Sequence, residues 1–574
     1  MKINKAKWML FTKKADFNGI AKKFGISPVT ARVIVNRGIS TDEEIGRFLR
    51  ADMSDMHDPF LMKDLKKAAD ILFSKIRENK KIRIVGDYDA DGICGCVILC
   101  KGLRSLGADA DADVPNRFVD GYGISKRMVD KAAEDGVDTI ITCDNGIAAA
   151  ESVSHAKDKG LTIIVTDHHE PQEEIPEADA VVDPKQKDCD YPFKELCGAG
   201  VAYKLMSAMG VNDKVLRELL KFAAIATICD IVKLQDENRI IAKNGLKLIN
   251  KEEASRPDGP GFNKGLRALI EKTGMNNKKI RSYEIGFVIG PCINAGGRLG
   301  SAKTGINLFL EEDPDICTKL AGELTDMNEE RKKITEESAK KASEIIEESC
   351  DDNVIVVYMP DCHEAVAGIV AGRIKDRFYR PAFVFTDAED GTIKGSGRSI
   401  DSCNMFEELK KCEDLLIRYG GHKKAAGVSM EKEKLEEFSK RINENAELSE
   451  DDLTKKVWID VPMYAEYPTE KLIEELACLE PFGEGNKKPL FADKGLLVED
   501  VRILGANRNF LKMVARTPRG KQVQIVKFIN ENPDELPTAG DTISVTYYPD
   551  VNEYGGDKTI QIKVEDFDID TNTD

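Results

Sequence analysis

Short acidic and histidine-containing motifs stand at four places in the first half of this 574-residue chain. They are Gly86-Asp87-Tyr88-Asp89-Ala90-Asp91-Gly92, Cys143-Asp144-Asn145-Gly146, Asp167-His168-His169-Glu170, and Asp230 inside the apolar run 222–232. Several carboxylates together with imidazole suit a hard or borderline divalent cation, and Mn²⁺ or Mg²⁺ fits best. Two such ions would hold both oxygens of an in-line phosphoryl displacement and activate a water. The motifs therefore predict a two-metal site.

Buried strands are predicted directly before three of these motifs, at residues 81–86, 138–143 and 161–166, with a short fourth strand at 180–183. Helices are predicted between them at 93–106 and 148–159, which indicates a parallel sheet covered on both faces. The carboxyl ends of parallel strands share one edge, so we expect the first three motifs to converge there. Asp230 lies among isoleucines and needs a partner or a cation, because a buried carboxylate is costly.

Each motif taken alone has a simpler interpretation. Asp87–Gly92 is also an acidic turn, and it resembles the start of a calcium-binding loop, but Ile98 stands where such a loop requires Glu. His168-His169 also suits a capping or surface pair, and Asp144-Asn145-Gly146 suits a turn. Their occurrence in order, at successive strand ends, favours one shared metal site.

The rest of the chain predicts further units. Thr41 to Glu44 is a capping box within a helical N-terminal region. One long helical pattern spans 315–350, which we interpret as a spacer rather than a coiled-coil seam. A second α/β unit follows, and from Trp458 the sequence becomes β-rich with frequent turns, as is typical of a small barrel. The predicted fold is thus α/β with these parts: a helical region 1–75 packing on a parallel-sheet domain 76–312, a connecting helix 313–350, a smaller α/β domain 351–447 and a β-barrel 455–570.

Composition narrows the function classes. The net charge of −17 disfavours a nucleic-acid binder when taken as an average. Residues 487–527, however, hold ten Lys/Arg against three Asp/Glu, whereas the residues from 528 onward hold twelve Asp/Glu against two Lys. The basic segment includes Arg508-Asn509-Phe510, a mixture of charge and aromatic surface that suits single strands, although an ordinary barrel surface is the alternative.

No stretch reaches the roughly 18 apolar residues of a membrane helix, and the first residues contain no signal-type apolar run. The 14 cysteines include no CxxC pair, which excludes the usual zinc and disulfide patterns. We therefore expect a cytoplasmic protein with free thiols and no membrane association.

These motifs resemble those of the DHH phosphoesterase family, named for the sequence that here is Asp167-His168-His169. The resemblance covers nearly the whole chain, and further segments that look like family motifs are 114–123, 293–302, 362–374, 394–399, 420–427, 479–491 and 552–556. It implies that 76–312 is the DHH domain, 351–447 the DHH-associated domain, and 455–570 an OB-fold nucleic-acid-binding domain.

The resemblance also implies roles for particular residues. The metal ligands fall on Asp89, Asp91, Asp144, His168 and Asp230, with Asp87 and His169 completing the catalytic set. Positions that line the phosphate and substrate groove fall on Asn294, Arg298, Arg373, Ser396, Arg398 and His422. Arg508 is added as a phosphate-binding residue from the basic and aromatic composition of its segment, not from the resemblance. Arg298 and Arg398, read from their glycine-rich neighbourhoods alone, suit phosphate oxygens or solvated ion pairs. Cys292, Cys362 and Ala365 depart from the family pattern around this groove.

The implied activity is a metal-dependent exonuclease of single-stranded DNA that uses two Mn²⁺ or Mg²⁺ ions. It would degrade 5′→3′ to 5′-mononucleotides in DNA repair and recombination, as a monomer working beside a helicase and a single-strand-binding protein. One alternative is a family phosphodiesterase acting on short oligonucleotides or small phosphate substrates, but members of that kind lack the added barrel. A second alternative is a non-enzymatic replication scaffold, but such proteins have lost acidic ligands that are all present here.

Overall fold

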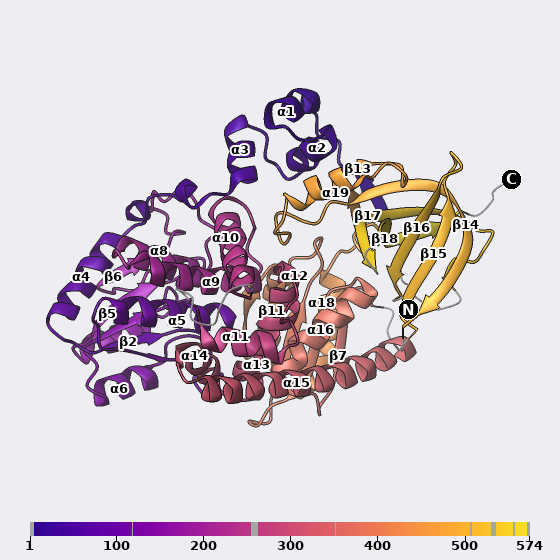
Figure 1. Cartoon of the computed structure of the whole chain (residues 1–574). Helices are drawn as coiled ribbons and strands as arrows, with labels where there is room; N and C mark the ends of the chain where they lie inside the picture. The colour runs from indigo at the N-terminus through magenta and orange to yellow at the C-terminus, as the bar shows by residue number, and fades with distance from the viewer. Residues whose placement is uncertain are drawn as a thin grey trace.

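The computed structural model describes residues 5–117, 119–253, 262–349, 352–505, 508–529, 535–554 and 557–570. Figure 1 shows two α/β units joined by one long helix, with a β-barrel at the end of the molecule opposite the first α/β unit. In the described part of the chain, no helix combines the length and the apolar character needed to cross a bilayer. Four residues of the predicted motifs and helices, Phe118, Cys350, Gly555 and Gly556, lie outside the described residues.

The first unit is built on a five-stranded parallel sheet with the order β3-β2-β4-β5-β6. Its strands are β2 (Ile82–Val85), β3 (Ala110–Asp113), β4 (Thr139–Thr142), β5 (Thr162–Thr166) and β6 (Ala180–Val182). The predicted parallel sheet is confirmed. Strand β3 has the sequence Ala-Asp-Ala-Asp, which contains no apolar run that would predict it.

Helices cover both faces of this sheet because alternate strand residues point to opposite sides. Ile84, Ile141 and Ile164 pack in one core with α5 (Ala90–Ser105), α8 (Gly198–Ala208) and α9 (Asp213–Cys229). Ile140 and Ile163 pack in another core with α6 (Lys126–Glu134) and α7 (Ala150–Asp158). The chain then continues through α10 (Asp236–Glu253), α11 (Lys264–Lys272), α12 (Ser282–Glu284), a π-helical turn (Ile285–Ile289), α13 (Gly290–Leu299) and α14 (Lys303–Leu310).

The predicted long helix is α15 (Pro314–Ser349), which packs against α13 and α14 of the first unit and against α16 (Glu364–Phe378) of the second. The second unit has a five-stranded sheet with the order β10-β11-β9-β8-β7. These strands are β7 (Ile355–Tyr358), β8 (Ala382–Asp387), β9 (Ile393–Arg398), β10 (Arg418–His422) and β11 (Ala425–Met430). This smaller α/β unit also agrees with the predicted fold class.

The predicted barrel is present near the C-terminus. Its main strands are β14 (Phe491–Leu504), β15 (Phe510–Arg516), β16 (Gln522–Phe528), β17 (Thr542–Tyr554) and β18 (Asp557–Ile569). The sheet closes because β14 pairs with both β15 and β17.

The N-terminal region packs differently from the expectation. Helix α4 (Leu65–Arg77) does pack on the first α/β unit, and α3 (Asp42–Arg50) begins with the predicted Thr41 capping box. However, α2 (Pro28–Asn36) and α3 place Val33, Ile34, Ile45 and Phe48 in the barrel core beside α19 (Glu470–Ala477). In addition, β1 (Lys7–Leu10) pairs with β12 (Lys456–Ile459). The expectation that all of 1–75 packs on the DHH domain is corrected, because the apolar faces of α2 and α3 are buried against the barrel.

Candidate metal centre

All seven predicted catalytic residues meet at the carboxyl edge of the parallel sheet. Three groups of side chains place their ligand atoms within 4.8 Å of one another: Asp144-His168-His169, Asp91-His168-Asp230 and Asp87-Asp89-Asp144. Asp144 and His168 each belong to two of these groups. The strand-end arrangement that the sequence predicts therefore produces one continuous cluster of oxygen and imidazole ligands.

Two of the carboxylates are fixed by helix N-termini. Asp89 caps α5, its Oδ1 accepting from the backbone N–H groups of Asp91 at 2.9 Å and Gly92 at 3.1 Å. Asp91 accepts from the first N–H groups of α8, those of Gly198 and Ala199, at 2.7 Å each. Burial and the charge of Asp89 raise the pKa of Asp91 to about 6. Gly92 is required by space, because an added Cβ would lie 2.3 Å from the Asp87 nitrogen.

Asp144 sits at the end of β4, the middle strand of the sheet, with a left-handed backbone (φ +62°) that few residues other than Gly, Asn and Asp adopt. Its side chain is buried, and its Oδ1 lies 3.1 Å from Nε2 of His168. The Tyr122 hydroxyl donates to its backbone oxygen at 2.9 Å. Burial and the neighbouring carboxylates, Asp91 first among them, raise the pKa of Asp144 well above its usual range.

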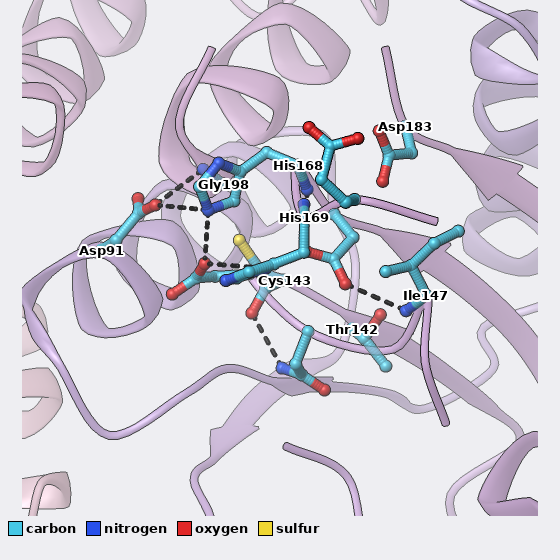
Figure 2. A network of polar contacts seen from close by, with 12 residues as sticks. Asp91, Thr142, Cys143, Ile147, His168, His169, Asp183 and Gly198 are labelled. Atoms are coloured by element: carbon cyan, nitrogen blue, oxygen red, sulfur yellow. Dashed lines mark hydrogen bonds and ion pairs between the residues drawn. The ribbon is translucent and has the colours of Figure 1, made fainter. Parts of the chain in front are cut away.

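The two histidines follow β5 and are oriented by Asp167. Figure 2 shows His168 pointing toward Asp91, whose Oδ2 lies 3.7 Å from the His168 Nε2. Oδ1 of Asp167 accepts from the His168 amide at 2.7 Å and lies 2.8 Å from Nδ1 of His169, while its Oδ2 accepts from the Ile147 amide at 2.9 Å. Burial lowers the pKa of His168 to about 3, which keeps it in the neutral form that ligates metals. Asp167 is not among the predicted site residues, although its place at the start of the Asp167-His168-His169 motif is the signal that could have identified it.

Asp230 reaches the cluster from the end of α9, with Oδ2 3.8 Å from Nε2 of His168. Burial and Asp91 raise its pKa to about 8, and burial and Asp89 do the same for Asp87. Asp87 also has a buried Oδ1 with no hydrogen-bond partner. Carboxylates held this close cannot all be ionised without a cation between them. No cysteine joins these groups among the described residues, so the donor set fits Mn²⁺ or Mg²⁺ rather than zinc.

Arginines gather beside the acidic cluster, between the two α/β units. Asn294 of α13 accepts from the Ala90 N–H at 2.7 Å, which places it next to Asp89, and Arg298 donates to the Ala365 oxygen of α16 at 2.8 Å. Burial and the charges of Arg117, Arg331 and Arg398 lower the pKa of Arg298 to about 10. Arg117, which stacks over the Tyr88 ring at 5.4 Å, is a member of this group that the sequence does not single out beyond its segment 114–123.

The remaining predicted substrate residues of the α/β units lie on the second unit. Ser396 precedes Arg398 by two residues on β9, and His422 ends β10, where burial and Arg398 lower its pKa. Arg373 is exposed on α16. The structure does not bring Arg508 to the metal cluster, since it occupies an exposed position before β15 of the barrel.

The residues that depart from the family pattern have structural partners. Cys292 is buried, with its Sγ 3.3 Å from Nδ2 of Asn328 on α15, and Cys362 is also buried. Ala365 presents to Arg298 a backbone oxygen, which any residue at this position would offer.

Comparisons with known proteins agree with this geometry. Residues 81–227 match the DHH family, N-terminal domain, residues 351–448 the DHHA1 domain, and residues 459–566 the RecJ OB domain. The single-stranded-DNA-specific exonuclease RecJ of Bacillus subtilis (strain 168) is 37% identical over 571 residues, which cover 99% of this chain and 71% of that relative. The crystal structure of RecJ from Thermus thermophilus in complex with Mn²⁺ has a TM-score of 0.82 at 30% identity, covering 98% of this chain and 80% of that one. The corresponding structure with Mg²⁺ has a TM-score of 0.76 at 29% identity, covering 98% and 78%.

Proposed function

The chain belongs to the RecJ family, and on this premise we propose that it is an exonuclease that degrades single-stranded DNA 5′→3′ and releases 5′-mononucleotides. The observation that carries the proposal is the cluster of Asp87, Asp89, Asp91, Asp144, His168, His169 and Asp230 facing a group of arginines. An acidic cluster for cations beside a basic group for phosphates is the arrangement that phosphodiester hydrolysis requires.

Asp89, Asp91, Asp144, His168 and Asp230 would hold two Mn²⁺ or Mg²⁺ ions, with Asp87 beside them. When bound, these ions supply Lewis acidity for the phosphoryl oxygens and lower the pKa of a coordinated water. The solved structures of RecJ with Mn²⁺ and with Mg²⁺ support the choice of these two cations.

The protein's own groups would orient the substrate. Asp167 holds the His169 ring through Nδ1, which leaves Nε2, 3.2 Å from the Tyr122 hydroxyl, to donate to a phosphate oxygen. Arg117, Arg298 and Arg398 offer forked donors in a partly desolvated place, where they favour a doubly charged phosphate over an internal diester. A terminal 5′-phosphate bound there would set the direction of degradation.

The barrel would bind the strand farther from its end. Lys512 lies on β15, two residues after Phe510. Phe528 is 68% exposed, and its ring lies 5.4 Å from the ring of Phe510. Exposed aromatic rings beside lysine and arginine suit base stacking along a single strand. Residues 455–570 are therefore proposed as a binding module that also includes Arg508.

Digestion of long single-stranded DNA labelled at the 5′ or the 3′ end tests the proposal. We expect release of labelled mononucleotide at once from the 5′ end only, with Mn²⁺ or Mg²⁺ present and no activity in excess EDTA. Immediate release of the 3′ label, or full activity in EDTA, would contradict it. Faster hydrolysis of a dinucleotide than of the long strand would instead favour the small-substrate alternative.

The cellular setting is part of the same proposal. All thirteen cysteines in the described residues are free, which suits the reducing cytoplasm. We infer a cytoplasmic monomer that acts in DNA repair and recombination beside a helicase and a single-strand-binding protein. Light scattering of the purified protein tests the monomer, and co-purification from cells tests the partners.

A further inference from the structure

Asp230 differs from the other proposed ligands because neither a sheet strand nor a helix N-terminus carries it. It caps the C-terminal end of α9, and the next residue, Ile231, has a left-handed backbone with φ +58° and a side chain that is 70% exposed. A β-branched residue in this conformation is a genuine outlier. Such a conformation persists only where the surrounding structure fixes it. The segment 231–235 therefore needs external support.

That support comes from residues 479–486, which lie between α19 and the barrel and which we call the docking loop. The Leu234 N–H donates to the Glu484 oxygen at 2.7 Å, and Nε2 of Gln235 donates to the Gly485 oxygen at 3.0 Å. Leu234 is buried directly against Gly483, where an added Cβ would lie 2.7 Å from the Leu234 Cδ1. The loop thus touches the chain four residues after Asp230, through backbone and side-chain contacts.

The docking loop is itself held in one shape. Asn486 is 1% exposed, and its Nδ2 donates to the oxygens of Leu479 at 2.8 Å and Pro481 at 2.9 Å. Gly483 and Asn486 exchange two backbone hydrogen bonds. Arg239 of α10, also buried, donates to the Leu479 oxygen at 2.9 Å. A loop with this many internal and external bonds can act as a rigid template.

The same loop contacts a second segment that leads to site residues. The Ser282 hydroxyl of α12 donates to the Phe482 oxygen at 2.5 Å. The chain then passes through the π-helical turn into α13, which carries Asn294 and Arg298. The docking loop is therefore bonded to two parts of the DHH domain that bring non-strand residues to the site.

We propose that the docking loop is a positioning element of the metal centre: it fixes segment 231–235 and thereby the orientation of Asp230. This rests on the proposed function, in which Asp230 is a metal ligand. In this view the barrel side of the molecule does more than hold DNA, since its docking loop also sets the affinity of the DHH domain for its cations. Displacing the loop should weaken metal binding when no DNA is present.

Gly483→Ala and Gly483→Val test the proposal, because each side chain would push against Leu234. Isothermal titration of the full chain with MnCl₂, without DNA, measures the affinity directly. We expect Gly483→Val to weaken Mn²⁺ binding about 10-fold, as outer-shell changes at metal sites do, and Gly483→Ala to weaken it less. Adding Leu234→Ala to Gly483→Val makes room for the new side chain, so the double variant should recover most of the affinity.

Two controls separate positioning from other effects. Gly322→Ala makes the same chemical change on α15, where an added Cβ meets nothing within 4 Å, and should leave the Mn²⁺ affinity unchanged. Lys512→Ala on the barrel should weaken DNA binding and leave the Mn²⁺ affinity unchanged. Hydrogen exchange at the Leu234 amide, which donates to the docking loop, should be faster in both Gly483 variants.

Wild-type Mn²⁺ affinity in a folded Gly483→Val variant would overturn the proposal, as would a double variant that binds no better than Gly483→Val alone. Should Gly483→Val fail to fold, the Gly483→Ala variant decides: faster exchange at the Leu234 amide together with unchanged Mn²⁺ affinity would overturn the proposal, because the loop contact would then be loosened without any effect on the metal centre. These outcomes are distinct from failure of the proposed function, which would show as a wild-type chain that binds no Mn²⁺ or cleaves no single strand.

Discussion

Asp144→Asn is the sharpest test of the metal centre. Asp144 contributes a ligand atom to two of the three groups of ligands, so it is placed to face both ions. The substitution removes one negative charge and leaves the shape of the side chain nearly unchanged. Asn also tolerates the left-handed backbone at this position (φ +62°), whereas Ala would add strain there. The Asn variant should therefore fold normally and isolate the effect of the charge.

The expected loss follows from electrostatics. A unit charge about 4 Å from a unit charge of opposite sign contributes roughly 4 kcal/mol at an effective dielectric constant near 20. A loss of about 4 kcal/mol in the transition state slows a reaction about a thousandfold. We therefore predict that Asp144→Asn cleaves single-stranded DNA about a thousandfold more slowly and holds fewer than two Mn²⁺ ions.

Single-turnover digestion of 5′-labelled single-stranded DNA measures the rate, and titration with MnCl₂ measures the stoichiometry. Binding of DNA, followed by fluorescence anisotropy, should survive because Arg298, Arg398 and the barrel are untouched. Asp183→Asn is the matched control, since Asp183 follows strand β6 of the same sheet but belongs to none of the three ligand groups. Two bound ions with normal turnover in Asp144→Asn would refute the shared-ligand reasoning and leave Asp144-Asn145-Gly146 as a turn.

Arg298→Ala and Arg398→Ala should each reduce the preference for a 5′-phosphorylated strand over a 5′-hydroxyl strand by about 10-fold or more, since each removes a charge-assisted hydrogen bond of about 1.5–3 kcal/mol; an unchanged preference would place the phosphate elsewhere. Neutralising Arg508 and Lys512 should flatten the salt dependence of DNA binding by about one unit of slope per lost phosphate contact, and equal slopes would remove them from the interface. Removing residues beyond about 450 together with residues 1–50, whose helices α2 and α3 pack on the barrel, should weaken affinity for long strands while slow cleavage remains at raised Mn²⁺ concentration, and equal affinity in the shortened chain would contradict the binding role of the barrel. In metal-free protein, burial and neighbouring carboxylates raise the pKa of Asp87 and Asp230 to about 8. The unfolded chain loses these protons at a lower pH than the folded chain does, so the melting temperature should fall as pH rises from about 4 to 8. Saturating Mn²⁺ should remove this fall.

The residues at the sheet edge of the site can be predicted from the sequence because their positions depend on neighbouring residues in the chain. An apolar run that ends in Asp, as at Asp144, predicts both the strand and the place of the carboxylate. The parts that were missed depend on contacts between distant segments. Asp91 is held by the N-terminus of α8, Arg117 joins Arg298 within the first α/β unit, and Arg398 joins them from the second unit. No spacing in the sequence encodes such contacts.

In the N-terminal region, too, the packing depends on distant contacts that the local sequence does not encode. The capping box at Thr41 and the apolar spacing of α3 determine that a helix forms and which face is apolar. They do not determine which domain covers that face. Ile45 and Phe48 pack with the barrel, although α4, the next α-helix along the chain, packs with the DHH domain. Shortening the chain near residue 450 would therefore also uncover apolar side chains of α2 and α3, so the N-terminal helices and the barrel should be treated as one unit in such experiments.

The distribution of charge explains how a chain with a net charge of −17 can bind a polyanion. The acidic residues of the site are gathered where cations are expected, at the sheet edge around Asp144. The arginines stand beside them, where burial and mutual repulsion already lower the pKa of Arg298 to about 10. An anionic phosphate placed among these arginines relieves that repulsion, just as cations relieve the repulsion among the carboxylates. Metal ions should therefore neutralise the clustered carboxylates, and the substrate phosphate should neutralise the clustered arginines. The local charges at the site, and not the average charge of the chain, then determine whether DNA binds.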